Sequence, residues 1–390
     1  MIPTSRLSKV AEFIRDGTHG SPVRTETGIP VLSAMNVKNG VLNFSTDRFT
    51  SLEEFEAFSR RLPLAKGDVL LTIVGTIGRA AVMDTVAPLI FQRSVAVIRP
   101  KESVYLGRYL YHVTQSQDFQ TQLDRAANKS SQAGVYLGKL GDTEVPLPPL
   151  PEQRRIAAIL DQADALRAKR REALAQLDSL TQSIFIEMFG DPVKNPKSWP
   201  VVNLGALIHS ASDGPHVSPT YADSGVPFLS TRHVRPGEIS WSDLKYLTQG
   251  EAEIQWRKCK PGLDDILYTK GGTTGFAAVV RTDEEFAVWV HVALLKPNKK
   301  LVNSTWLEAM LNSQYCYRQS QELTHGIANR DLGLKRMVNI LMYHPPLELQ
   351  HQFKQHMEVL ADQKKRQQLS LAELDTLFTA LQHRAFRGEL

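Results

Sequence analysis

The sequence predicts an α+β protein in which two similar globular domains are separated by a pair of long antiparallel helices, with an approximate two-fold axis. Three observations lead to this fold class. Two proline-preceded segments, in the middle and at the end of the chain, have helical apolar periodicity. The segments before them repeat at a constant offset of 197 positions. Each repeat mixes short β-branched runs with amphipathic segments, as α+β domains do.

The first long helix is predicted over residues 148–190. Pro151 suits a first helical turn, and Gly190 suits a helix end. About 38 helical residues after Pro151, at ~1.5 Å each, give ~57 Å, whereas a domain of ~150 residues is roughly 40 Å across. Its apolar stripe therefore needs another long helix; packing on its own domain is the less favoured alternative. Arg167 and Arg171 interrupt the stripe, so packing there is either looser and polar or, as the favoured alternative, the charges form a solvated face. The predicted pairing or docking positions are Ile156, Leu160, Leu166 and Leu177.

The second long helix is predicted over residues 345–390. It follows another proline pair, Pro345 and Pro346, and again has a polar middle. The predicted pairing or docking positions in this helix are Phe353, Leu360, Leu374 and Leu381.

The two globular domains are predicted over residues 1–147 and 191–344. Residues 68–72 (DVLLT) match residues 265–269 (DILYT), and the same offset holds for other blocks along the chain. Short links place the end of the first helix and the start of the second beside the second domain. The helices must then run antiparallel, which predicts a dumbbell.

The composition is that of an ordinary globular protein. The 390 residues are 42% hydrophobic and 22% charged, and the net charge of +5 leans weakly toward polyanionic partners. Two cysteines, Cys259 and Cys316, give neither a disulfide framework nor a zinc spacing. This cysteine usage favours a reducing cytoplasm, and we expect no metal site. Because no apolar run approaches a membrane span, we also expect no membrane contact.

Common enzyme motifs do not occur in the sequence. The glycine-rich segments lack the Lys-Ser/Thr of a phosphate-binding Walker loop, and no nucleophile elbow, HExxH pair or adenosylmethionine loop is present. We therefore predict no catalytic residue. A duplicated active site built from nonlocal residues, such as that of a nucleic-acid hydrolase or methyltransferase, is the less favoured alternative.

Two repeated regions have the chemistry of DNA contacts. Residues 75–79 and 270–275 combine glycines, hydroxyls and a cation, which suits a phosphate oxygen, although a tight turn explains them equally well. Residues 33–38 and 230–235 keep their frame but change polar side chains, as two modules reading different base edges would. Solvated loop residues are the alternative at each single position. The predicted DNA-binding residues are Thr18, His19, Asn36, Lys38, Thr76, Arg79, Gln92, Arg93, Asn128, Lys129, His216, Arg232, His233, Arg235, Lys270, Thr273, Thr274, Asn329 and Arg330.

Residues 145–157 (VPLPPLPEQRRIA), with residues 67–71 and 76–78, resemble the specificity subunit of type I restriction-modification systems. The start of the second helix keeps only Gln350 of that pattern. The resemblance implies a non-catalytic DNA-recognition subunit whose two target-recognition domains each read half of a bipartite site. It implies that the helices set the spacer and dock two methyltransferase subunits, through which restriction subunits join. The chain itself would bind no cofactor, and S-adenosylmethionine is expected on the methyltransferase subunits. A coiled-coil scaffold without sequence-specific DNA binding is the alternative.

Overall fold

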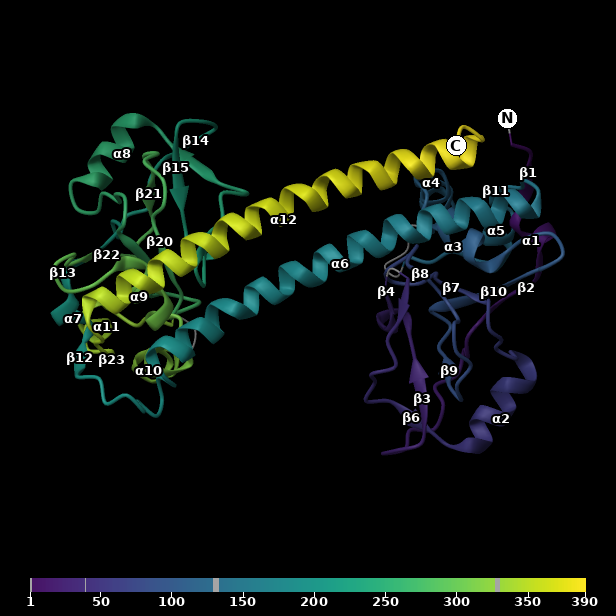
Figure 1. Ribbon diagram of the computed structural model, residues 1–390, viewed down its shortest axis with the longest axis horizontal. Coiled ribbons are helices and arrows are strands. Elements are labelled where there is room, and N and C mark those ends of the chain that lie inside the picture. The colour runs from purple at the N-terminus through teal and green to yellow at the C-terminus, as the bar shows by residue number, and fades with distance from the viewer. Residues whose placement is uncertain (1, 39, 129–132, 327–329) are drawn as a thin grey trace. The chain divides into compact units, whose positions relative to one another are not determined.

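The computed structural model describes residues 2–38, 40–128, 133–326 and 330–390, and the chain divides into two compact units. Unit 1 comprises residues 1–172 and 369–390, and unit 2 comprises residues 173–368. Figure 1 shows the helices and strands of both units. Because the division falls within the long helices, one end of each helix belongs to each unit. The predicted domain boundaries after residues 147, 190 and 344 stay predictions.

The two long helices have nearly the predicted extents. Helix α6 runs over Leu150–Phe189 and helix α12 over Leu347–Arg387, 40 and 41 residues respectively. Gly190 and Gly388 follow them with φ of +86° and +77°, the left-handed conformation that commonly ends a helix. No helix within the described ranges is both long and apolar enough to cross a membrane.

Unit 1 is built around an antiparallel sheet with the strand order β2-β10-β7-β8. Its strands are β2 (Ala11–Asp16), β10 (Val95–Pro100), β7 (Val69–Thr72) and β8 (Ala80–Val82). A three-stranded sheet contains β6 (Phe49–Thr50), β3 (Ile29–Leu32) and β9 (Ile90–Phe91), and two-stranded sheets pair β1 (Thr4–Arg6) with β11 (Glu144–Pro146) and β4 (Val37–Lys38) with β5 (Val41–Leu42). The shorter helices are α1 (Leu7–Val10), the 3-10 helix η1 (Ala34–Asn36), α2 (Leu52–Arg61), α3 (Gly107–Thr114), α4 (Gln117–Ala126) and α5 (Leu137–Gly141).

Unit 2 repeats this topology in its central sheet, which has the order β13-β22-β19-β20. Its strands are β13 (Ile208–Asp213), β22 (Val292–Pro297), β19 (Ile266–Thr269) and β20 (Ala277–Val279). A second sheet contains β14 (Tyr221–Ala222), β18 (Lys245–Leu247), β15 (Val226–Leu229) and β21 (Ala287–Val288), and two-stranded sheets pair β12 (Val201–Asn203) with β23 (Leu341–Tyr343) and β16 (Val234–Arg235) with β17 (Glu238–Ile239). The helices are α7 (Leu204–Leu207), η2 (Thr231–His233), α8 (Gln249–Trp256), α9 (Ser304–Leu311), α10 (Gln314–Leu323) and α11 (Leu334–Met337).

All four central strands of unit 2 lie 197 positions after their counterparts in unit 1, which confirms the repeat and the α+β prediction. The central sheet of unit 1 has a hydrophobic core on each face, because Val69 and Leu71 of β7 belong to one buried cluster and Leu70 to another. In unit 2, Tyr268 and Leu267 divide between two cores in the same way. This two-sided burial explains why these strands read as continuous apolar runs.

The glutamine that both helix starts share anchors each long helix to its own unit. Gln153 is fully buried, and its Oε1 accepts the N–H of Leu106 at 2.9 Å. Gln350 is also fully buried and accepts the N–H of Asn303 at 2.9 Å. Each glutamine donates Nε2 to the proline carbonyl five residues earlier, at 2.8 Å. Since the buried backbone groups need this partner, the glutamine remains where the rest of the motif has changed.

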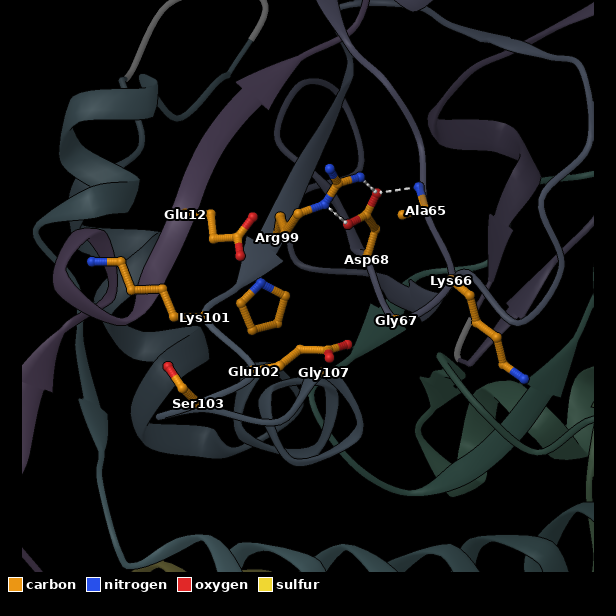
Figure 2. A pocket seen from close by; sticks show the side chains of 11 residues that line it. Glu12, Ala65, Lys66, Gly67, Asp68, Arg99, Lys101, Glu102, Ser103 and Gly107 are labelled. Carbon is orange, nitrogen blue, oxygen red and sulfur yellow. Dashed lines mark hydrogen bonds and ion pairs between the residues drawn. The ribbon is translucent and has the colours of Figure 1, made fainter.

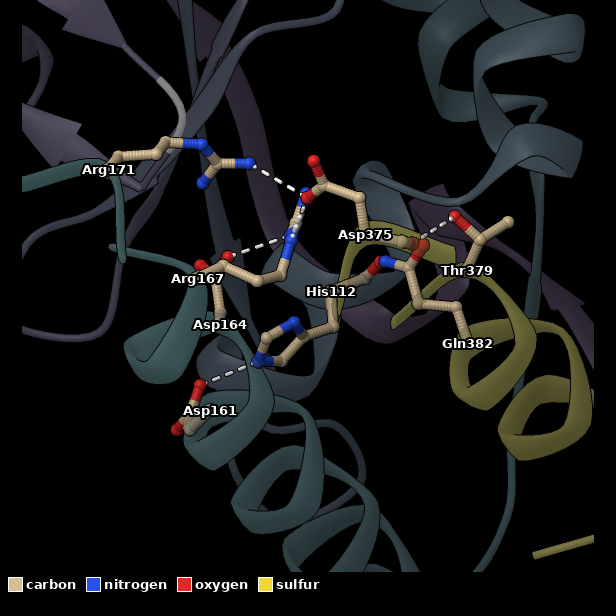
Figure 3. Close-up of polar contacts among 8 residues, drawn as sticks. All are labelled: His112, Asp161, Asp164, Arg167, Arg171, Asp375, Thr379 and Gln382. Carbon is tan, nitrogen blue, oxygen red and sulfur yellow. Dashed lines mark hydrogen bonds and ion pairs between the residues drawn. The ribbon is translucent and has the colours of Figure 1, made fainter. Parts of the chain in front are cut away.

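The two long helices contact each other within each unit, which confirms the predicted helix pair. In unit 1, Arg167 of α6 bonds Asp375 of α12 at 2.5 Å (Figure 3). The guanidinium of Arg167 also lies 4.2 Å from the ring centroid of Phe378. In unit 2, Lys364 of α12 pairs with Asp178 of α6. This second ion pair is the first one shifted by 197 positions. The polar middle of each helix is therefore part of the pairing.

The predicted pairing positions differ in burial. Ile156, Leu160 and Phe353 are fully buried, whereas Leu166 is 55% exposed. At this point of α6 the neighbouring Arg167 contacts α12, so Leu166 faces solvent, and the docking role predicted for Leu166 stays a prediction. The remaining positions are half-buried and are Leu177, Leu360, Leu374 and Leu381.

Candidate nucleic-acid interface

Several loops of unit 1 meet at one edge of its central sheet, where β2 and β7 end and β10 begins. The N–H of Arg93 donates to the carbonyl of Thr18 at 3.0 Å, and the N–H of Gln92 donates to Leu32 O at 2.8 Å. The loop that carries Thr76 is attached to this group, since Ile73 N donates to Ser94 O at 2.9 Å, and Gly75 N donates to Ala133 O at 3.2 Å. Segments up to 75 positions apart in the sequence are thus hydrogen-bonded to each other, and we call this surface the loop edge of unit 1.

The loop edge of unit 2 has the same backbone frame. The N–H of Trp289 donates to Leu229 O at 2.8 Å, which repeats the bond of Gln92. The N–H of Gly272 donates to Arg330 O at 2.9 Å, which repeats the bond of Gly75. The frame is therefore shared by the two units, while the side chains that it carries differ.

Most of the predicted DNA-binding residues present polar atoms at or near these edges. The exposed ones are His19, Lys38, Thr76, Arg93, His216, Arg232, Arg235, Thr273 and Arg330, and the half-buried ones are Thr18, Arg79, Gln92 and Asn128. Lys129 and Asn329 lie outside the described residues. His19 contacts Asp16 at 2.8 Å, and His216 contacts Asp213 at 3.7 Å, so one acidic residue holds the equivalent histidine in each unit.

Asn36 and His233 form turns, so the predicted role of reading base edges is wrong for both. Asn36 is 8% exposed, and its Oδ1 accepts the N–H of Ser33 at 2.9 Å. His233 is 3% exposed, and its Nδ1 accepts the N–H of Ser230 at 2.8 Å. Burial, together with the charge of the adjacent Arg232, lowers the pKa of His233. Asn36 and His233 thus cap the same turn in the two units. Because the residue types differ, the sequence did not reveal this shared role.

Lys270 and Thr274 are also buried, so neither is free to bind a phosphate as predicted. Lys270 is 5% exposed, and its ammonium lies 3.2 Å from Asp213 and 3.5 Å from Asp331. Burial raises the pKa of Asp213, but hydrogen bonds from Lys258 and Lys270 outweigh it, and the net pKa is lowered. Thr274 is 2% exposed, and its hydroxyl lies 3.1 Å from that of Thr324. The buried charge explains why the glycine-rich segment of unit 2 carries a lysine.

A cavity of about 460 Å³ in unit 1 contains none of the predicted residues (Figure 2). It lies at the edge of the sheet opposite the loop edge, where β7 begins and β10 ends. Asp68 and Arg99 form an ion pair of 2.8 Å beside it, and the lining includes both acidic and basic side chains. Such mixed charge does not fit a polyanion.

A smaller cavity, of about 260 Å³, lies in unit 2 and is lined in part by Trp289. Its lining contains the aromatic residues Tyr221 and Phe228 and the cations Arg232 and Lys245. Tyr221 and Lys245 were not predicted, because they lie on strands of two and three residues with no periodic signal. No cluster of three or more His, Cys, Asp or Glu side chains suited to a metal ion occurs in the part of the chain that the structure describes.

Comparisons of the sequence with known proteins find specificity proteins of type I restriction systems. Residues 4–176 match the family described as the type I restriction modification DNA specificity domain. The EcoBI specificity subunit of Escherichia coli is 25% identical over 335 residues, which cover 78% of this chain and 70% of that protein. The EcoKI specificity subunit of Escherichia coli K12 is 21% identical over 391 residues, covering 93% of this chain and 82% of that protein.

Solved structures share the fold over nearly the whole chain. The S subunit of a type I restriction-modification system from M. genitalium has a TM-score of 0.57 and 14% identity, covering 98% of this chain and 96% of that one. A chain from a study of the assembly and conformational transition of the type I R-M system also has a TM-score of 0.57, with 20% identity and full coverage of both chains. The family match over residues 4–176 and these relatives make the chain similar to the specificity subunits of type I restriction-modification systems, and the solved structures show that it shares their fold.

Proposed function

We propose that this chain recognises a bipartite duplex DNA sequence for a type I restriction-modification complex, with each loop edge reading one half. The observation that carries this proposal is the backbone frame repeated in two units with different exposed side chains. Gln92 and Met35 of unit 1 correspond to Trp289 and Arg232 of unit 2 at an offset of 197. Different groups on one frame are what recognition of two different half-sites requires.

The exposed cations at the loop edges supply the contacts to the DNA backbone. Arg93 in unit 1 and Arg330 in unit 2 are exposed beside glycine-containing loops. Arginine and lysine bind phosphates in any sequence and fix the register of the protein, while other groups read the bases. Binding then weakens as salt rises, because neutralised phosphates release their counterions.

The long helices hold the two recognition units and dock the partners. The chain works with two methyltransferase subunits, to which restriction subunits attach, in the cytoplasm where duplex DNA is accessible. S-adenosylmethionine binds the methyltransferase subunits, and this chain binds no cofactor. Leu166 and Leu377 support a docking role, because these apolar side chains are 55% and 52% exposed on α6 and α12.

The alternatives fit less well. A coiled-coil scaffold has no need of two polar loop edges on one repeated frame, and the relatives are named specificity subunits. The same names place the chain's role in recognition, with catalysis left to other subunits. A scaffold would also show no salt-dependent affinity for DNA.

Methylome sequencing of cells that express this chain with its cognate methyltransferase tests the proposal. We expect a split motif with two half-sites and an unread spacer. Replacing residues 198–344 with the same segment of a paralogue is expected to change one half-site and leave the other unchanged, because each unit has its own loop edge and cores. The unmodified chain expressed in parallel is the control. A change in both half-sites would contradict independent reading.

The spacer length is expected to follow the helices. Inserting four residues into each helix, after Glu172 and after Gln368 where the units divide, adds ~6 Å, or nearly two base pairs. We expect a longer spacer between unaltered half-sites in the methylome. Substituting four residues at the same points without changing the length serves as the control and should leave the spacer as it was. Altered half-site sequences would rule out a spacer set by the helices.

A further inference from the structure

We propose that the cavity of about 260 Å³ in unit 2 receives one DNA base that leaves the duplex stack. This inference rests on the proposed function and names how unit 2 reads part of its half-site. The cavity is many times the ~30 Å³ that one water molecule occupies in the liquid, so it has room for a larger group.

The walls of the cavity are aromatic rings. The ring centroids of Tyr221 and Phe228 are 6.0 Å apart, and those of Phe228 and Trp289 are 5.9 Å apart in an edge-to-face arrangement. Phe228 is 3% exposed, whereas Tyr221 is 43% exposed and Trp289 is half-buried. Aromatic faces attract the faces of bases, which are accessible only after a base has left the stack.

Two cations also line this aromatic cavity. The ammonium of Lys245 lies 4.0 Å from the ring centroid of Tyr221, which holds it against that ring. Arg232 is held by hydrogen bonds from Nη2 to Asp243 O at 2.8 Å and from Nε to His233 Nε2 at 3.3 Å. Both side chains are exposed, so they are placed to bind the phosphates on either side of an extruded nucleotide.

The cavity adjoins the loop edge through Trp289 and His291. Their ring centroids are 6.3 Å apart, and His291 O accepts the N–H of Lys270 at 2.9 Å. DNA held at the loop edge of unit 2 therefore passes the mouth of the cavity.

Unit 1 lacks this arrangement at the same positions of the repeat. The residues 197 positions before the three aromatic ones are Arg24, Val31 and Gln92. Because the frame folds with these residues in unit 1, the aromatic walls of unit 2 are not required by the fold. A glutamine reads base edges within a duplex, whereas a tryptophan offers a stacking surface. The two units therefore read their half-sites by different means.

The test uses the full chain in complex with its methyltransferase subunits and duplexes that carry the motif found by methylome sequencing. A mismatch is placed in turn at each position of the unit 2 half-site, and affinity is measured by competition. At one position other than the methylated adenine, we expect roughly tenfold tighter binding than to the matched duplex, because an unpaired base leaves the stack at lower cost. Trp289→Ala is expected to abolish this gain, and Trp289→Phe to retain most of it.

Gln92→Ala, the matched substitution in unit 1, is expected to weaken binding through the unit 1 half-site. The ratio of mismatched to matched affinity at the unit 2 half-site, measured for this variant, should stay unchanged. If Trp289→Ala does not fold, Lys245→Ala replaces it, with the same expected loss of the gain. Specific binding without a mismatch gain that depends on Trp289 or Lys245 overturns the cavity proposal and leaves the proposed function standing. A complex that does not prefer the motif over unrelated duplexes refutes the proposed function itself.

Discussion

Replacing Phe353 with alanine is expected to destabilise unit 2 by about 3–5 kcal/mol, the usual cost of truncating a buried aromatic residue. Phe353 is fully buried where α12 leaves the unit 2 core. Its ring centroid lies 5.7 Å from that of Phe185 and 5.4 Å from that of Phe189, both in edge-to-face geometry. Its removal leaves a cavity at the contact between α6 and α12 in unit 2, with Phe185 and Phe189 losing their partner.

Urea unfolding followed by hydrogen exchange of unit 2 amides measures this loss, since the midpoint falls while the slope stays constant. The control is Val359→Ala on the same helix, because Val359 is 61% exposed and should change the free energy of unfolding by less than ~0.5 kcal/mol. A loss below ~1 kcal/mol for Phe353→Ala would mean that this aromatic contact does not hold the helix pair.

Replacing Asp213 with asparagine is expected to cost unit 2 about 3–5 kcal/mol, because it leaves a buried cation with reduced compensation. The side chains of Asp213 and Lys270 are each 6% exposed and lie 3.2 Å apart. Asp331, the other carboxylate beside Lys270, is 46% exposed and lies 3.5 Å away. Thermal or urea unfolding of the variant at neutral pH measures the effect.

A second substitution separates the buried charge from a general packing defect. Lys270 corresponds to Ile73 of unit 1 at the offset of 197, so the fold accepts isoleucine at this position. Adding Lys270→Ile to Asp213→Asn should therefore restore most of the lost stability. A double variant as unstable as Asp213→Asn would show that the ion pair is not the cause.

The Asp213 effect also depends on pH in a defined direction. The net pKa of Asp213 is lowered, since hydrogen bonds from Lys258 and Lys270 outweigh the effect of burial. Because the pKa is lower in the folded state, the ionised carboxylate stabilises the folded protein at pH values above the unfolded pKa of about 3.9. This stabilisation is lost as the pH falls through the pKa of the folded state. The difference between the wild type and Asp213→Asn should be complete at pH 7 and shrink below about pH 4.

The long-range organisation was predictable because local signals repeat along the chain. The prolines before α6 and α12 and the constant offset indicated the two helices and the duplicated sheets. The burial of individual polar residues was less predictable. Leu166 matched the apolar stripe but is exposed, because Arg167 uses the adjacent position to reach Asp375 and Phe378.

In the candidate site, too, the sequence did not predict which side chains are buried. Lys270 and Thr273 occur in one glycine-rich loop, yet only Thr273 is exposed, because Asp213 on β13 draws the lysine inward. Tyr221 and Lys245 carry no signal in the sequence, since short strands bring them to Trp289 from distant positions.

The sequence by itself determined the duplication, the two long helices and the loops that form each edge, because periodicity and repeated motifs are properties of neighbouring residues. Only the tertiary structure decided which polar side chains of those loops face solvent and which cap turns or pair inside. The partners of Lys270 are the carboxylates of Asp213 and Asp331, which lie far from it in the chain. Asn36 and His233 bond within their own turns, but segments from elsewhere in the chain bury those turns, so the neighbouring residues do not reveal it.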